Sequence, residues 1–180
     1  MLTGQRVRLR PIERADLPKY VVWLNDPEVI RGLSMYIPLS QSQEEKWLEG
    51  IEQGPPAERP LAIEIRAPEG WLHVGGIGFH SVNWRDRNAE VGLFIGEKHF
   101  WNQGYGSDAL RLMLRYGFDG LNLHRIYLQV YENNLRAVHS YEKVGFVHEG
   151  RQREARFFRG KYLDVLWMSI LRSEWADVEV

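Results

Sequence analysis

The chain has 180 residues, of which 44% are hydrophobic and 26% charged, and its formal net charge is -1. This composition is globular and argues against disorder and coiled coil. The small net charge gives no electrostatic reason to expect nucleic acid or acidic membranes as partners. No cysteine is present, which excludes disulfides, thiolate metal sites and a cysteine acyl-enzyme.

The length fits a single domain, and we expect residues 1–180 to form it. No segment approaches the roughly 18 uninterrupted apolar residues that a membrane-spanning helix needs. The first six residues lack the apolar stretch of a signal peptide. The expected location is therefore the cytoplasm.

The first half of the chain predicts helices followed by a run of strands. Residues 6–10 alternate between polar and apolar side chains, which is the period of a half-buried strand, and Pro11 ends it. A helix is predicted over 13–24, with Pro18 in its first turn, where proline is tolerated. The remaining elements expected in this half are a helix over 43–51 and strands over 61–66, 72–82 and 89–95.

The second half predicts an alternation of helices and strands. An amphipathic helix is expected to include 110–118, followed by a strand over 125–131 and a helix over 135–144. A further strand is expected to begin at 146–149, and the last covers 163–171. These elements indicate an α/β (α+β) fold with one mixed sheet and helices packed on it.

A glycine-rich segment lies between a predicted strand and the helix that follows it. Gly104 and Gly106 flank a tyrosine there, and glycines let the backbone approach a ligand closely. The unpaired amides at a helix start favour an anion such as a pyrophosphate. The alternative is a simple tight turn in which Ser107 or Asp108 caps the helix. Neither a Walker loop nor a full Rossmann fingerprint is present.

A second motif runs from Glu132 to Phe146, with the sequence ENNLRAVHSYEKVGF. Asn134 is expected to cap a helix that Gly145 ends. Helical spacing places Asn134, Ala137 or Val138, and Tyr141 on one face. One groove would then be lined by a polar residue, a small apolar residue and a phenol.

Together the two motifs resemble the GNAT superfamily of N-acetyltransferases. The segment WNQGYG at 101–106 is similar to its pyrophosphate loop, and Asn134 to Phe146 to its second conserved block. The segments VRLRP at 7–11 and WLNDPEV at 23–29 resemble the ribosomal-protein (RimJ/RimL-like) branch, which includes spermidine acetyltransferases. The resemblance implies a mostly antiparallel twisted sheet of about seven strands, flanked by about four helices.

The resemblance also implies acetyl-CoA as co-substrate and a primary amine as acceptor. One departure is Trp101, because the family often has arginine or glutamine there, so a side-chain contact to phosphate is lost. The cofactor-binding residues that the resemblance and the loop chemistry imply are Phe94, Ile95, Gly96, Asn102, Gln103, Gly104, Tyr105, Gly106, Ser107 and Asn134.

Two residues are the candidates for acid–base chemistry. By resemblance Tyr141 is the acid that protonates the departing thiolate, since a phenol of pKa about 10 is protonated at neutral pH. Strand alternation places Glu90 opposite the apolar face, and the resemblance implies a carboxylate there that acts as base through water. The alternatives are a packing role for Tyr141 and a solvated or ion-paired Glu90.

Without cysteine, transfer is expected to run directly between two bound substrates, the alternative being that serine or another residue serves as nucleophile. The acceptor is left open among a protein N-terminus, a polyamine and a small amino compound. The rival hypothesis is a non-catalytic acyl-CoA-binding sensor or scaffold. No metal site, membrane or nucleic acid is expected, and a homodimer is one option for the oligomeric state. The basic segment 151–161 is expected to be a solvated hairpin with its aromatic side chains packed below, the alternatives being an acceptor-side loop and an RNA-facing patch.

Overall fold

The computed structural model describes residues 1–175, and one sheet runs through that part of the chain. It has eight strands in the order β1-β2-β3-β4-β5-β6-β8-β7. Only β5 and β6 pair in parallel, so the sheet is mixed and mostly antiparallel. The strands are β1 Leu2–Thr3, β2 Val7–Pro11, β3 Leu61–Ala67, β4 Gly70–Asn83, β5 Asn88–Ile95, β6 Arg125–Tyr131, β7 Val147–Phe158 and β8 Lys161–Leu171.

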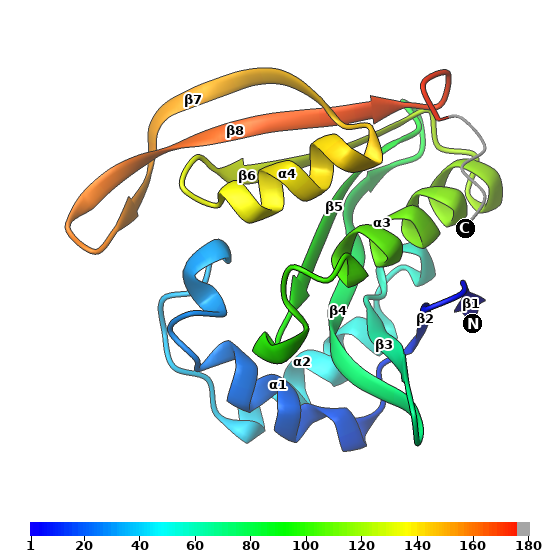
Figure 1. Cartoon of the computed structure of the whole chain (residues 1–180), viewed down its shortest axis with the longest axis vertical. Coiled ribbons are helices and arrows are strands. Elements are labelled where there is room, and N and C mark those ends of the chain that lie inside the picture. Colours follow the sequence, from blue (N-terminus) through cyan, green and yellow to red (C-terminus); the bar gives the residue numbers. More distant parts are fainter. Residues whose placement is uncertain (176–180) are drawn as a thin grey trace.

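Four α-helices lie on the two faces of this sheet, with α3 and α4 side by side and α1 and α2 lower in the view (Figure 1). Their bounds are α1 Leu17–Leu24, α2 Gln41–Gln53, α3 Tyr105–Arg115 and α4 Leu135–Val144. A π-helical segment, η5 Tyr116–Gly120, extends α3, and short 3-10 turns are η1 Arg14–Asp16, η2 Ile30–Gly32, η3 Pro56–Glu58 and η4 Lys98–Phe100. Within residues 1–175, no helix combines the length and apolar character that crossing a bilayer requires.

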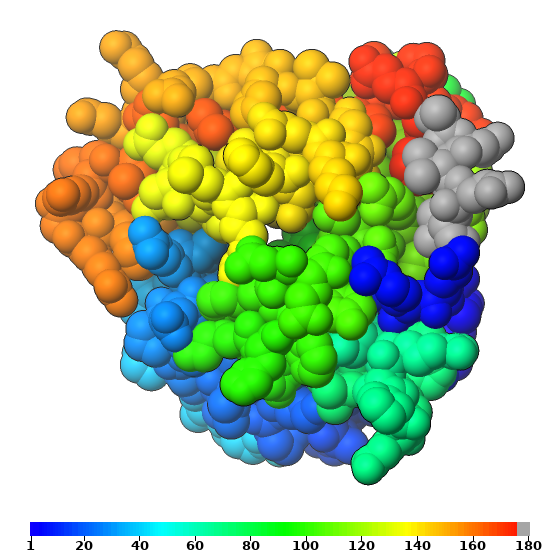
Figure 2. Space-filling model, in the orientation of Figure 1, coloured from blue at the N-terminus to red at the C-terminus, as the bar shows by residue number. Residues whose placement is uncertain are grey.

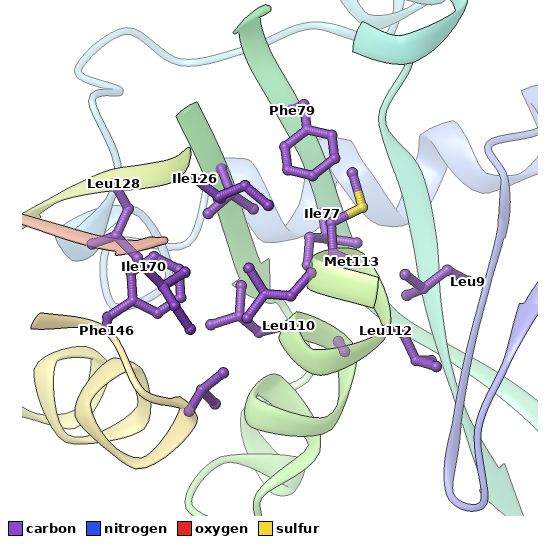
Figure 3. Close-up of a cluster of buried hydrophobic side chains, with 14 of the residues drawn as sticks. Leu9, Ile77, Phe79, Leu110, Leu112, Met113, Ile126, Leu128, Phe146 and Ile170 are labelled. Carbon is purple, nitrogen blue, oxygen red and sulfur yellow. The ribbon is translucent and has the colours of Figure 1, made fainter. Parts of the chain in front are cut away.

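The two faces of the sheet carry separate hydrophobic cores. The larger core joins the sheet to α3 and α4, and ten of its side chains are labelled in Figure 3. Leu110 and Ile126 are fully buried in it, and burial of each contributes about 1.5–3 kcal/mol. The smaller core packs α1 and α2 on the other face around Tyr20 and Trp23, with Phe94 of β5 against it. Neighbouring residues of β5 therefore belong to different cores.

The strands β5 and β6 separate soon after they begin to pair. Their parallel register covers Asn88 to Glu90 of β5 and Arg125 to Tyr127 of β6. Beyond it, β5 continues beside β4 as far as Ile95, whereas β6 continues beside β8. Figure 1 shows the two strands diverging behind α3 and α4. The backbone in the second half of β5 thus faces a gap instead of another described strand.

Most of the predicted elements are present, and the differences have local causes. The predicted strand at residues 6–10 and the helix over 135–144 are confirmed, and Pro18 lies in the first turn of α1. The sheet has eight strands where about seven were expected, because the two-residue β1 pairs with β2 without any alternation of its own. The hairpin β7–β8 is confirmed, but the packing expected for its aromatics is wrong for Phe157, which is 64% exposed and lies against Tyr162.

Candidate active site

A cavity of about 900 Å³ opens where β5 and β6 diverge. In the space-filling view a hollow lies between the yellow atoms of α4 and the green atoms of the loop before α3 (Figure 2). Its volume is within the range of cofactor sites. Its walls come from η2, the end of β5, the start of α3, the end of β6 and one face of α4. Loop, helix and strand segments distant in sequence therefore meet around one site.

The glycine loop presents backbone amides to this cavity. Helix α3 begins at Tyr105, and its N-cap is Gly104, which has φ of 85° and no side-chain cap. The alternative cap by Ser107 or Asp108 is wrong, because both residues lie inside the first turn. Asp108 instead forms an ion pair with Arg6 at 2.5 Å. The first amides of α3 are left for an anionic ligand, as a pyrophosphate requires.

Trp101 and Arg136 close one side of the cavity. The Trp101 indole N–H donates a hydrogen bond to the Ile95 carbonyl at 2.7 Å, which fixes the ring at the end of β5. The Arg136 guanidinium lies 3.8 Å from the centroid of the Trp101 ring. Both side chains line the cavity, and Arg136 has no carboxylate partner among residues 1–175. The positive charge of Arg136 in α4 thus lies beside Trp101, the loop position at which the polar side chain common in the family is missing.

Sequence reasoning missed Arg136. The residue follows Asn134 by two positions and, by helical spacing, lies off the face shared by Asn134 and Tyr141. Its contact with Trp101 depends on how α4 approaches the loop, which no local pattern encodes. The signal available in the sequence was an arginine inside the second motif together with the aromatic residue where the loop usually carries a polar one.

Helix α4 contributes the phenol. The Asn134 side chain accepts a hydrogen bond from the Ala137 amide at 3.4 Å, and Gly145 ends the helix with φ of 106°, so both predicted caps are confirmed. Tyr141 lines the cavity, and its ring centroid lies 6.0 Å from that of Phe146. Burial raises the pKa of Tyr141 to about 12, and the positive charge of Arg136 opposes this only in part. The phenol is protonated at every pH near neutrality.

Strand β5 directs its carboxylate to the opposite face. Ala89 and Val91 are buried in the larger core, whereas Glu90 points to the side of the sheet that carries α1 and α2, as the alternation predicts. The Gln129 amide of β6 donates a hydrogen bond to Glu90 Oε1 at 3.2 Å. Gln129 lines the cavity, and Glu90, which accepts its hydrogen bond, is not part of the lining. The phenol and the carboxylate therefore stand on opposite faces of the sheet, with the strand gap between them.

The structure brings nine of the twelve predicted site residues to the cavity wall. Gly96 lies outside the wall, and a Cβ there would come within 2.2 Å of the Trp23 ring, so this glycine makes room for the tryptophan. Gln103 also lies outside and donates its amide to the His99 carbonyl at 2.6 Å. Glu90 is the third. The nine are Phe94, Ile95, Asn102, Gly104, Tyr105, Gly106, Ser107, Asn134 and Tyr141.

Comparisons with known proteins agree with this geometry. The family model for the acetyltransferase (GNAT) domain matches residues 6–147. A spermidine N(1)-acetyltransferase of Vibrio cholerae is 33% identical over 97% of this chain and 98% of its own length. A putative ribosomal N-acetyltransferase of Bacillus subtilis, YdaF, is 31% identical over 56% of this chain and 55% of its own.

A solved structure extends the likeness to the fold. The spermidine N-acetyltransferase from Vibrio cholerae, in complex with CoA and spermine, superposes with a TM-score of 0.86 at 30% identity. The match covers 95% of this chain and 98% of that one. The family model spans most of the chain, including the glycine loop and the second motif, and the fold is that of the solved relative. The chain belongs to the GNAT acetyltransferase family.

Proposed function

We propose that this acetyl-CoA-dependent N-acetyltransferase transfers acetyl directly to a primary amine, with Tyr141 as acid and Glu90 as base. The observation that carries the proposal is the placement of the two groups. Tyr141 belongs to the α4 side of the sheet, Glu90 to the α1/α2 side, and the diverging β5 and β6 leave a passage between them. A thioester in that passage is reached by the phenol from one side and by an amine from the other.

The cofactor end is proposed at the loop between β5 and α3. Amides from Asn102 to Ser107 would hold the pyrophosphate, with Arg136 supplying positive charge from α4. The backbone near Phe94 and Ile95 faces the strand gap and would pair with the pantetheine amides in the manner of an added strand. This arrangement directs the thioester towards the middle of β5.

The proposed reaction is one addition and one elimination. A neutral amine attacks the thioester carbonyl, and an N–H of β5 near Phe94 stabilises the oxyanion. The C–S bond then breaks, and the Tyr141 hydroxyl protonates the leaving thiolate. Glu90 accepts, through water, the proton that the ammonium form of the acceptor must lose before it attacks, and the proton that the nitrogen loses after attack restores the Tyr141 hydroxyl. Because no thiol nucleophile exists in the chain, no acetyl-enzyme is needed.

The relatives support an amine as the acceptor, but their names point to two different classes of amine. Some are named spermidine acetyltransferases and one a putative ribosomal N-acetyltransferase. Both kinds of acceptor carry a primary amine. That residues 1–180 form one catalytic domain is part of the proposal, since strands from Leu2 to Leu171 share one sheet. That the protein is located in the cytoplasm and that it forms a homodimer remain predictions from the sequence.

The proposal is tested by following thiol release from acetyl-CoA with a panel of amines. We expect turnover with at least one amine, none with acetyl-CoA alone, and initial-rate plots against the two substrates that intersect. Direct transfer predicts intersecting lines because both substrates are bound when the acyl group moves. Parallel lines together with an isolable acetylated protein would contradict direct transfer, and release of no thiol with any amine would contradict the activity.

A valine at position 106 is expected to weaken acetyl-CoA binding at least about tenfold while the fold is retained. A Cβ on Gly106 would meet Leu93 at an ordinary 3.6 Å, so the fold accommodates it, and Gly106 lines the cavity at the first amides of α3, where we propose that the phosphates approach the backbone. Titration calorimetry with acetyl-CoA measures the change. Gly150→Val in β7 is the matched control, because a Cβ there has no neighbour within 4 Å. Unchanged affinity in Gly106→Val would remove this loop from the site.

A further inference from the structure

The face of the sheet that carries Glu90 continues along β6 to a fixed positive charge. Gln129 and Tyr131 lie on this face of β6, and a step of two residues along a strand spans about 7 Å. Gln129 donates a hydrogen bond to Glu90, and the Tyr131 hydroxyl accepts a hydrogen bond from Arg156 at 2.5 Å. We call these four residues, Glu90, Gln129, Tyr131 and Arg156, the acceptor face. An acceptor longer than one amine must extend over this face or along the cavity wall.

Arg156 is held on this face by two hydrogen bonds and by its position over the Tyr131 ring. Besides Tyr131, it donates to the Leu33 carbonyl at 2.7 Å, and its guanidinium lies 4.0 Å from the centroid of the Tyr131 ring. Its Nε is buried without a hydrogen-bond partner. No carboxylate among residues 1–175 pairs with it. The charge is therefore fixed in place and not neutralised by the protein.

The cavity wall beside the acceptor face also carries positive charge. Arg31 and Arg159 line it without an ion pair in the described part of the chain. The wall holds one carboxylate, Glu28, and Lys98 already binds it at 2.5 Å. The carboxylates at the end of β6 and in β8, Glu132 and Asp164, both pair with Arg151. Among the carboxylates of the acceptor face and the cavity wall, Glu90 is therefore the one without a cationic partner in residues 1–175.

We propose that the acceptor is the α-amine of an amino acid or peptide and not a polyamine, an inference that rests on the proposed function. A polyamine has several positive charges, and each one buried near the site needs a carboxylate or exposure to water. Here the acceptor face holds one carboxylate, Glu90, and one cation, Arg156, and the adjoining cavity wall adds Arg31 and Arg159, so the positive charges of a polyamine would meet like charges at a cost in affinity. The carbonyl or carboxylate oxygens beside an α-amine suit arginine-rich surroundings.

The base that we propose, Glu90, also suits an α-amine as acceptor. An α-amine of pKa about 8 is partly neutral at pH 7, whereas deprotonating an amine of pKa about 10.4 costs roughly 4–5 kcal/mol at that pH. A single carboxylate that acts through water is sufficient for the first kind of amine. The acceptor class therefore differs from that named for the Vibrio cholerae relative, although the cofactor end is shared.

Steady-state kinetics with a panel of acceptors tests the inference. The panel contains amino-acid amides and short lysine-free peptides with different first residues, together with spermidine and spermine. We expect kcat/KM for the best α-amine to exceed that of either polyamine at least about tenfold. A polyamine as the best acceptor of the panel would overturn the inference while leaving the acetyltransferase activity established.

Binding supplies a readout that does not depend on turnover. Spermine is titrated into the protein–CoA complex by calorimetry at low ionic strength, where attraction between charges is strongest. We expect no saturable binding at millimolar spermine. Saturable binding would overturn the inference even if no amine of the panel were acetylated, so failure of the activity and failure of the acceptor class are told apart.

A third experiment reverses the charge of one residue that lines the cavity. Arg159→Glu is expected to raise the ratio of kcat/KM for spermidine to that for the best α-amine by about tenfold. Arg153→Glu makes the same change on an exposed residue of the same hairpin that does not line the cavity, and it should leave the ratio unchanged. An equal ratio in Arg159→Glu and Arg153→Glu would show that the wall charge does not select the acceptor.

Discussion

Replacement of Tyr141 by phenylalanine is expected to lower kcat by about 10²–10⁴-fold and to leave acetyl-CoA affinity unchanged, as removal of a general acid does. The substitution keeps the ring that packs against Phe146 and the larger core, and it removes only the hydroxyl. The thiolate then leaves without a proton donor at hand. Stopped-flow or steady-state thiol release measures kcat, and calorimetry measures the affinity.

The pH dependence of this defect follows from the raised pKa of Tyr141. Burial moves the pKa to about 12, so the phenol of the wild-type protein is protonated at both pH 7 and pH 10. The ratio of wild-type to variant kcat should therefore be constant over that interval. A donor with an ordinary pKa of about 10 would be half deprotonated at its upper end, and the ratio would fall there.

Tyr116→Phe is the matched control. Tyr116 is also half-buried and stacks on Phe79, with ring centroids 6.4 Å apart, but it lies in η5 outside the cavity wall. Loss of its hydroxyl should change kcat by less than a factor of about two or three. An equally small effect of Tyr141→Phe would assign Tyr141 a packing role and leave water or another group as the proton donor.

The parts of this protein that sequence predicts well are those that local chemistry determines. Helix α4 has its predicted bounds because Asn134 caps one end and Gly145 adopts a positive φ at the other. Strand β6 has its predicted bounds because it alternates cleanly, with Ile126, Leu128 and Val130 buried. The two motifs that identify the family are of this kind, since each lies within about fifteen residues of chain.

The parts that sequence does not predict depend on distant segments. Arg156 and Leu33 are 123 positions apart, and nothing near either residue indicates that they meet. The stacking of Arg136 on Trp101 likewise joins α4 to a loop across the cavity. The alternative of a Ser107 or Asp108 cap for α3 is wrong because Gly104 takes a left-handed conformation and the helix begins at Tyr105, before both residues. Acceptor choice depends on contacts of this kind, which is why the sequence left it open.

Glu90→Gln is expected to lower kcat/KM for the amine by about 10²–10⁴-fold near neutral pH, with acetyl-CoA affinity retained. The substitution keeps the length of the side chain and removes the charge that accepts the proton. The neighbouring Gln129 amide still finds an oxygen at this position, so the contact between β5 and β6 is preserved. Glu69→Gln, an exposed change in the turn between β3 and β4, removes the same charge away from the site and serves as control.

The defect of Glu90→Gln should depend on both pH and acceptor. As pH rises towards the pKa of the amine, more of the acceptor is neutral before it binds, and a base contributes less. The defect should therefore shrink between pH 7 and pH 9, and it should shrink at lower pH for an α-amine of pKa about 8 than for an amine near 10.4. Parallel pH–rate profiles for wild type and variant with both acceptors measure this. An equal defect at every pH and for every acceptor would mean that Glu90 positions Gln129 or the acceptor and that solvent takes the proton.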